Sequence, residues 1–179
     1  ISIYINDIQL YGYNGANHLL SNDRRINEES SEISCTMAEK ANGRCVYYNV
    51  ADEKLIYMAK QIKDVLTMEP LGILRTSIKI SYLKKMTLTA QESLSAHIFL
   101  LGQDKNILLE SAGENTDLKD QKWLDQINGN SGNLRFNLDG KAYNLVYQTS
   151  SDTGLTVVGM ILPAFCRKRH GNWKKLLCC

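Results

Sequence analysis

The 179-residue sequence lacks an apolar run of the ~20 residues that a membrane-spanning helix requires. The best candidate, Leu155 to Phe165, is too short and is interrupted by Pro163. The first residue is Ile1 rather than Met, and no basic segment of the kind that opens a signal peptide follows it. We therefore expect the chain to be an excised, soluble part of a longer protein.

The sequence also lacks the motifs of common enzyme classes. It has no phosphate-binding glycine loop, no dinucleotide fingerprint, no nucleophile elbow and no His-Glu-x-x-His motif. A calcium loop at residues 137–140 fails, because it would place Arg135 in the first ligand position and Val146 where a bidentate acid is required. A freestanding hydrolase that uses Cys35 and His97 remains an alternative, since such residues need only meet in space. We expect no catalysis by this chain and no cofactor.

Metal-binding cysteine patterns are missing as well. No two cysteines have C-x-x-C spacing, and no histidine stands at zinc-ligand spacing from a cysteine pair, so we expect no metal site. Three of the five cysteines, Cys166, Cys178 and Cys179, lie in the last segment of the chain. Cys35 and Cys45 could form a disulfide in an oxidising compartment or stay free and buried, and the sequence leaves both open.

The formal net charge of +2 is distributed unevenly along the chain. From Ala164 onward there are five basic residues and no acid. Without these five, 16 of the 21 basic residues remain against 19 acids, so the body has a net charge of −3. A mildly acidic body argues against nucleic-acid binding, which needs clustered Lys and Arg on a folded face. Residues 164–179 alone would suit anionic lipid or nucleic acid, but we expect them to be a flexible or non-native tail.

In the first half of the chain, hydrophobic spacing predicts one helix among several strands. Ile33, Met37 and Ala41 fall on one face of a helix over residues 28–41, and Asn42-Gly43 is a typical stop. The other segments read as short alternating or apolar runs between turn residues. We expect strands at 7–11, 44–50, 54–62 and 71–80, a turn at 12–15, a loop at 17–27 and a turn at 67–70.

The predicted strand over residues 71–80 ends in a clear alternation. Ile78 and Ile80 alternate with Ser77 and Lys79. A strand with this pattern turns one set of side chains to the core and the other to solvent. We therefore expect the isoleucines to lie on the buried face of this strand.

The second half of the chain is organised around residues 134–163. Asp139-Gly140 lies between two apolar or alternating runs, which is the strongest short-range signal for a two-residue hairpin, because both central residues need positive φ. Pro163 ends the last run, since proline has no N–H to donate to a sheet. We expect a three-stranded antiparallel meander at 134–138, 141–148 and 153–163. Before it, we expect a short helix within 81–96, a hairpin over 97–109, a polar helix over 117–128 anchored by Trp123 and Ile127, and a flexible loop at 129–132.

These elements predict an α+β fold with two PAS-like lobes, each an antiparallel sheet flanked by helices. Two parts of the sequence resemble a known family: the run Pro70-Leu-Gly-Ile-Leu74, which follows a helix and two strands, and the ending from Gly140 to Pro163. The family is that of the extracytoplasmic double-Cache sensor domains of bacterial membrane receptors, especially sensor histidine kinases. The sequence departs from that pattern at Leu155, where tryptophan is usual, and at Lys60, where related kinases often have arginine.

The resemblance implies a division of the chain. It places a membrane-distal PAS-like lobe at 1–80, a linker helix at 81–96, a smaller membrane-proximal lobe at 97–163 and the basic, cysteine-containing tail at 164–179. Related ectodomains also have a long N-terminal helix that braces both lobes. Residues 1–5 would be the remaining end of that helix.

The resemblance also implies a small-ligand pocket in the first lobe. Tyr47, Tyr57, Lys60 and Arg75, with Tyr48 beside them, lie on strands that line the pocket in similar domains. Tyrosine offers a rigid apolar face with a polar tip, and a Lys or Arg can anchor a carboxylate. The alternative is that these tyrosines are ordinary sheet residues and that the cations point to water.

The function implied is that of an extracytoplasmic ligand-sensing domain of a bacterial two-component sensor histidine kinase. Such a domain binds a small solute on the extracellular side of the cell membrane, to which the full-length parent is tethered, and signals across it. Methyl-accepting chemotaxis receptors and cyclases use similar domains, so either is an alternative parent. A scaffold module without a ligand is an alternative of another class. The resemblance leaves open a homodimer and does not identify the solute.

Overall fold

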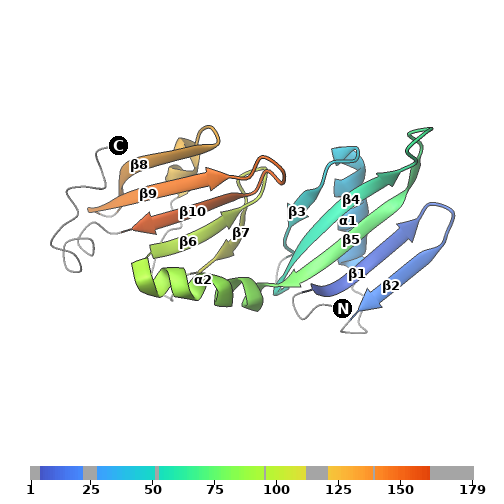
Figure 1. Ribbon diagram of the computed structural model, residues 1–179, viewed down its shortest axis with the longest axis horizontal. Coiled ribbons are helices and arrows are strands. Elements are labelled where there is room, and N and C mark those ends of the chain that lie inside the picture. The colour runs from blue at the N-terminus through green and yellow to red at the C-terminus, as the bar shows by residue number, and fades with distance from the viewer. Residues whose placement is uncertain are drawn as a thin grey trace. The chain divides into compact units, whose positions relative to one another are not determined.

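The computed structural model describes residues 5–21, 28–50, 53–94, 96–111, 121–138 and 140–161. Within these residues, ten strands form two five-stranded antiparallel sheets (Figure 1). The chain divides into two compact units. The first contains the described residues up to Lys85 together with Gly102–Leu109, and the second contains Met86–Leu101 together with the described residues from Glu110 onward. The two sheets confirm the predicted α+β fold with two PAS-like lobes.

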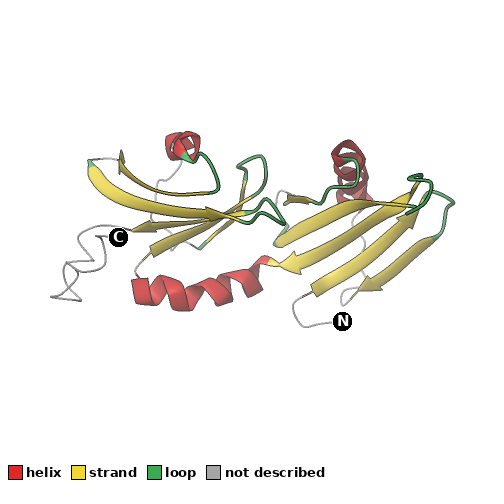
Figure 2. Cartoon of the chain, turned by 45° about the horizontal axis from the view of Figure 1, so that its top comes forward, coloured by secondary structure: helices red, strands yellow, loops and turns green. Residues whose placement is uncertain are grey.

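One helix covers one face of the first sheet (Figure 2). The elements are β1 (Ile5–Gly12), β2 (Asn17–Ser21), α1 (Glu28–Ala41), β3 (Val46–Tyr48), β4 (Leu55–Lys63) and β5 (Pro70–Lys79). The strand order is β2-β1-β5-β4-β3, so β5 lies at the centre of the sheet. The core between helix and sheet contains Ala38 of α1 packed with Tyr48, Tyr57 and Ile73. The first unit therefore buries its central strands under α1.

Helix α1 confirms the sequence prediction in its buried face and at its C-terminal end. Ile33 and Met37 are partly buried and pack against the core cluster, as their spacing predicts. At the C-terminal end, Asn42 has φ 51° and Gly43 has φ 91°. These left-handed conformations turn the chain out of the helix, and asparagine and glycine adopt them more readily than other residues.

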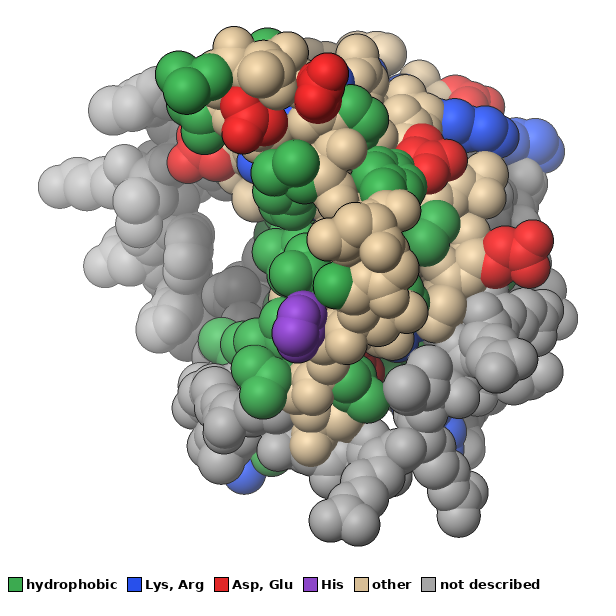
Figure 3. Space-filling view, turned by 90° about the vertical axis from the view of Figure 1, so that its right-hand side faces the viewer, with side chains coloured by type: hydrophobic (Ala, Val, Ile, Leu, Met, Phe, Trp, Pro, Cys, Tyr) green, Lys and Arg blue, Asp and Glu red, His purple; other side chains and the backbone are tan. Residues whose placement is uncertain are grey.

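The predicted loop at 17–27 is wrong for residues 17–21, which form β2; residues 22–27 lie outside the described residues. Strand β2 pairs with β1, with His18 opposite Leu10. It is an edge strand that exposes four of its five residues, and apolar side chains gather on this end of the unit (Figure 3). A strand without a buried face has no alternation to detect, so only its pairing with β1 defines it.

The prediction of which face of β5 is buried is also wrong. Ile73, Arg75 and Ser77, which alternate along this strand, are buried, whereas Ile78 is only half-buried. Ile80 does not belong to the strand, because it begins α2 (Ile80–Leu94). The central strand therefore turns polar side chains toward α1, which requires partners for them inside the protein.

The second sheet has the strand order β7-β6-β10-β9-β8. The elements of this part of the chain are β6 (Ala96–Leu101), β7 (Ile107–Glu110), the 3-10 helix η1 (Gln121–Gln126), β8 (Ser131–Leu138), β9 (Lys141–Thr149) and β10 (Thr156–Ile161). Helix η1 lies on one face of this sheet (Figure 2), and the Trp123 ring packs against Phe99 with centroids 5.0 Å apart. Trp123 and Ile127 are both buried, which confirms them as the anchor of this segment. Residues 121–126 of the helix predicted over 117–128 are thus 3-10 rather than α, and residues 127–128 are not helical.

Strands β8, β9 and β10 form the predicted antiparallel meander. Gly140 has φ 73° in the turn between β8 and β9, as the hairpin signal requires. The flexible loop predicted at 129–132 is wrong for its second half, because Ser131 and Gly132 pair with Gln148 and Tyr147. Asp139, Pro163 and the tail at 164–179 lie outside the described residues.

Gly132 is the position in this meander where a side chain would fit worst. A Cβ atom there would lie 2.5 Å from the hydroxyl oxygen of Tyr147 and 2.6 Å from its ring. Tyr147 cannot move away easily, since its hydroxyl bonds the backbone of Asn128. We predict that Gly132→Ala lowers the free energy of unfolding by about 1–3 kcal/mol through overpacking, as measured by denaturant titration.

Gly159 provides the matched control in the same sheet. A Cβ atom there would have its nearest neighbour at 3.9 Å, so Gly159→Ala should change the stability by less than about 0.5 kcal/mol. Equal losses in the two variants would contradict the packing argument.

Candidate ligand-binding site

A row of polar residues crosses the face of the first sheet that α1 covers. The register places Asp7 of β1 opposite Ser77 of β5, and Ser77 opposite Tyr57 of β4. In the neighbouring row, Gln9 lies opposite Arg75. Asp7, Gln9, Arg75 and Ser77 are all buried. Because side chains alternate between faces along a strand, these residues project from the same side of the sheet.

Arg75 is the centre of this polar face, with a side chain that is 3% exposed. Its Nη2 lies 3.8 Å from Oδ1 of Asp7, and its Nη1 donates a hydrogen bond of 3.4 Å to Ser31 Oγ on α1. The guanidinium carbon lies 5.0 Å from the centroid of the Tyr57 ring, in a cation–π contact. A buried guanidinium needs such partners, since an uncompensated buried charge is strongly destabilising.

The carboxylate of Asp7 has two oxygens in different surroundings. Oδ2 accepts hydrogen bonds from Ser77 Oγ at 2.5 Å and from Asn6 Nδ2 at 3.1 Å. Among the described residues, none donates a hydrogen bond to Oδ1, although Arg75 forms its ion pair there. The side-chain oxygen of the neighbouring Gln9 also lacks a donor within the described part of the chain. This face therefore presents two buried acceptors that an incoming N–H group could satisfy.

Three tyrosines surround the polar face. Tyr48 and Tyr57 stack with ring centroids 5.4 Å apart and an interplanar angle of 17°. Tyr48 shares a hydrogen bond with Ser34 of α1, Tyr57 donates to Glu53, and Tyr11 donates to Ser31 at 2.5 Å. Burial raises the pKa of Tyr11, and it raises that of Tyr48 to about 12, against the opposing effects of hydrogen bonding and of Arg75. The phenols of Tyr11 and Tyr48 therefore stay neutral at physiological pH.

The four residues predicted from the sequence fall on two faces of the sheet. Tyr57 and Arg75 lie together on the face toward α1. Tyr47 pairs with Met58, and Lys60 pairs with Leu74. These four residues alternate along their strands with the ones that face α1, so Tyr47 and Lys60 project from the other face of the sheet. The structure brings together Tyr57 and Arg75 and separates them from Tyr47 and Lys60.

Several residues of the polar face were not singled out from the sequence. Asp7 is a charged residue inside a strand, and Ser77 was expected on an exposed face. Ser31 and Ser34 are ordinary polar residues of an amphipathic helix. The available signal was weak: Asp7, Arg75 and Ser77 are polar residues within strands, and nothing local shows that they meet.

The alternative hydrolase pair of Cys35 and His97 gains no support from this geometry. Cys35 lies on α1 in the first unit and His97 on β6 in the second. Burial raises the pKa of the Cys35 thiol, and the charge of Glu39 raises it further, so the reactive thiolate is disfavoured. Cys35 and Cys45 are both free thiols. Among the described residues, no group of three His, Cys, Asp or Glu side chains could hold a metal ion.

The Asp7–Arg75 ion pair yields a prediction about stability. Arg75→Gln should lower the free energy of unfolding by about 3–5 kcal/mol, because it leaves the buried carboxylate of Asp7 without its counter-charge. Adding Asp7→Asn to this variant should restore part of that loss. Denaturant titration of the single and double variants measures both effects. Arg44→Gln, at an exposed position of the same unit, is the control and should cost less than about 0.5 kcal/mol.

The raised pKa of Tyr48 predicts a pH dependence. The folded state favours the neutral phenol, so the stability it contributes is complete below pH ~10 and is lost as the pH rises toward 12. Over that range the wild-type protein should lose about 2 kcal/mol more than Tyr48→Phe, which keeps the ring but cannot ionise. Parallel pH profiles of the two proteins would contradict the assignment.

No protein-family model matches the sequence, and no curated protein matches it either. Solved structures do resemble the fold. The ligand-binding domain of the Pseudomonas aeruginosa amino-acid chemoreceptor PctB, solved with L-Arg, matches with a TM-score of 0.65 and 13% identity over 92% of this chain and 68% of that one. The extracellular domain of the putative histidine kinase rpHK1S-Z16 matches with a TM-score of 0.63 and 13% identity over 94% and 75%. The ligand-binding domain of Mlp24, solved with asparagine, matches with a TM-score of 0.57 and 14% identity over 90% and 70%. The chain therefore has the two-sheet, Cache-like α+β fold of ligand-binding sensor domains.

Proposed function

We propose that this chain is the extracytoplasmic ligand-sensing domain of a bacterial two-component sensor histidine kinase. In this proposal it binds a small solute on the polar face of the first unit and performs no catalysis itself. The fold is that of sensor domains, which include the extracellular domain of a histidine kinase. The observation that carries the proposal is the buried Asp7–Arg75 pair beneath α1, with unsatisfied acceptors beside it.

The chemistry of this face suits a zwitterionic solute. Arg75 can anchor a carboxylate, while Asp7 Oδ1 and the Gln9 side-chain oxygen can accept hydrogen bonds from an ammonium group. The Tyr57 ring offers an apolar surface between them. The similar domains of PctB and Mlp24 were solved with L-Arg and asparagine. We therefore propose an amino acid, or a solute of similar charge, as the ligand.

Of the residues predicted from the sequence, the proposal assigns Tyr57 and Arg75 to the ligand site. Asp7 and Gln9 join them from β1, which the sequence did not suggest. Tyr47 and Lys60 project from the opposite face and are not assigned to this site. Lys60 is therefore a control position that separates the two faces.

Strand β5 offers a direct route from this site to the next element of the chain. Arg75 and Ser77 lie on β5, and the strand continues at Ile80 into α2 without an intervening loop. We propose that solute binding shifts β5 and biases α2, which would act as the linker helix at 81–96. The part of the chain that forms the first sheet would then be the membrane-distal lobe at 1–80, and the part that forms the second sheet would be the membrane-proximal lobe at 97–163. A ligand can bias such an element only by binding its two states unequally.

The proposal places the domain on the extracellular side of the cell membrane, with the full-length parent tethered there. Among the described residues, no helix has the length and apolar character needed to cross a lipid bilayer. A chemotaxis receptor is the second candidate parent, because PctB is a chemoreceptor and its domain has the same fold. Sequencing the gene on both sides of this region tests the assignment. Flanking hydrophobic segments followed by a kinase domain are expected, and their absence would overturn it.

We predict that a thermal-shift screen of the L-amino acids, organic acids and sugars finds a stabilising ligand. A ligand at about 100 times its Kd should add about 2.7 kcal/mol to the free energy of unfolding. Asp7→Asn should abolish the shift given by that ligand, and Gln9→Ala should weaken it, because both change acceptors on the polar face.

The matched control for this screen is Lys60→Gln, which changes a cation on the opposite face of the same sheet. It should leave the shift unchanged. Loss of binding in Lys60→Gln with retention in Asp7→Asn would move the site to the other face. A screen in which no compound stabilises the protein would favour the scaffold alternative.

A further inference from the structure

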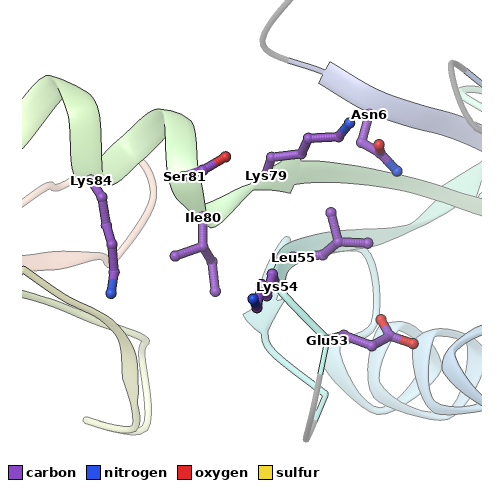
Figure 4. A pocket seen from close by; sticks show the side chains of 8 residues that line it. All are labelled: Asn6, Glu53, Lys54, Leu55, Lys79, Ile80, Ser81 and Lys84. Atoms are coloured by element: carbon purple, nitrogen blue, oxygen red, sulfur yellow. The ribbon is translucent and has the colours of Figure 1, made fainter.

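A second candidate site lies in the first unit outside the polar face. A cavity of about 710 Å³ is formed where β1 begins, where the chain enters β4 and where β5 continues into α2 (Figure 4). Its lining residues are Asn6, Glu53, Lys54, Leu55, Lys79, Ile80, Ser81 and Lys84. All of them belong to the first unit, and neither Asp7 nor Arg75 is among them. Its volume is in the range of small-molecule sites in proteins.

The charge of this cavity is strongly one-sided. Three of its lining residues are lysines, Lys54, Lys79 and Lys84, and Glu53 is the single acid among them. Figure 4 shows Lys79 extending toward Asn6 on β1 and Lys84 projecting from the first turns of α2. The first turn of α2 contains no acidic residue, so the positive end of the helix dipole is not neutralised within the helix itself. The lining therefore carries two more positive than negative charges.

The remaining lining residues define what kind of anion would fit. Leu55 and Ile80 give the cavity an apolar part, which suits a carbon skeleton better than a bare inorganic ion. Ser81 adds a hydroxyl group that can donate a hydrogen bond. Lysine recognises carboxylate and phosphate as a point charge, without the planar geometry that arginine imposes.

We propose that this cavity binds a small organic dianion, either a dicarboxylate or a phosphate monoester. The surplus of two positive charges matches the charge of such a ligand, and the apolar part accommodates its carbon chain. The lysines come from three different segments, the entry to β4, the end of β5 and α2, so the ligand would bridge elements that are separate in sequence. The proposal stands apart from the amino-acid site, because the two involve different side chains.

The cavity is nevertheless in contact with that site through two of its lining residues. Asn6 donates a hydrogen bond to Asp7 Oδ2, and Glu53 accepts one from Tyr57. A dianion in the cavity would therefore lie next to groups that hold the polar face in place. The experiment has to separate direct binding in the cavity from binding at Asp7 and Arg75.

The test is isothermal titration of the purified chain with succinate and with glycerol 3-phosphate, each at up to ~10 mM, which would fill a site with a Kd of about 1 mM. Binding of one or both is expected, and the stronger of the two identifies the anionic group. Lys79→Gln and Lys84→Gln should each weaken binding about tenfold, the effect of one charge-assisted hydrogen bond. Glu53→Gln, which keeps an acceptor for Tyr57, should strengthen binding instead. Raising the ionic strength should weaken it.

Lys40→Gln is the matched control, because it removes an exposed cation of the same unit on α1, away from the lining residues. It should leave the affinity for either dianion unchanged. Absence of binding by both probes overturns the proposal, and so does equal weakening in Lys40→Gln and Lys79→Gln. Loss of dianion binding in Asp7→Asn with retention in the two lysine variants would place the anion on the polar face and also overturn it. Failure of the amino acids in the thermal-shift screen would leave the result of this titration unaffected.

Discussion

The burial of one guanidinium group governs the organisation of the first unit. Arg75 lies on the central strand of its sheet with a side chain that is 3% exposed, and moving such a charge out of water is costly unless partners surround it. Those partners come from three other elements: Asp7 from β1, Tyr57 from β4 and Ser31 from α1. The register of the strands and the position of the helix must therefore both be correct before Arg75 is stable in its place.

The cores of the two units differ in composition. The second unit fills its core with apolar side chains such as Phe99, Trp123, Leu145 and Met160. The first unit also buries charged and polar side chains, among them Asp7 and Arg75. Buried polar groups stabilise a fold less well than apolar packing of similar volume. Natural proteins break the rule of an apolar core mainly where a site requires it. This contrast is why the proposed solute site lies in the first unit.

Local patterns predicted elements whose identity depends on neighbouring residues along the chain. Helix α1 has its apolar residues at helical spacing and ends at Asn42 and Gly43, both of which favour the left-handed turn that terminates it. The hairpin at Gly140 follows from the same kind of local preference. Strand β2 was not predicted because it is an exposed edge strand without hydrophobic alternation. Ser131 and Gly132 were not predicted as strand residues because serine and glycine do not favour strands, and only their pairing with β9 places them in the sheet.

Local sequence patterns predicted the α+β class and the positions of α1, of the helix that follows β5 and of the meander. They also singled out Tyr57 and Arg75 as candidate ligand residues. Which face of each strand lies under α1 depends instead on how the elements pack. Successive side chains of a strand point to opposite faces, so an error of one residue in that choice reverses every assignment. It is the packing of α1 over β4 and β5, and the pairing of β1 with β5, that unites Arg75 with Asp7 and Tyr57 and leaves Tyr47 and Lys60 on the other side.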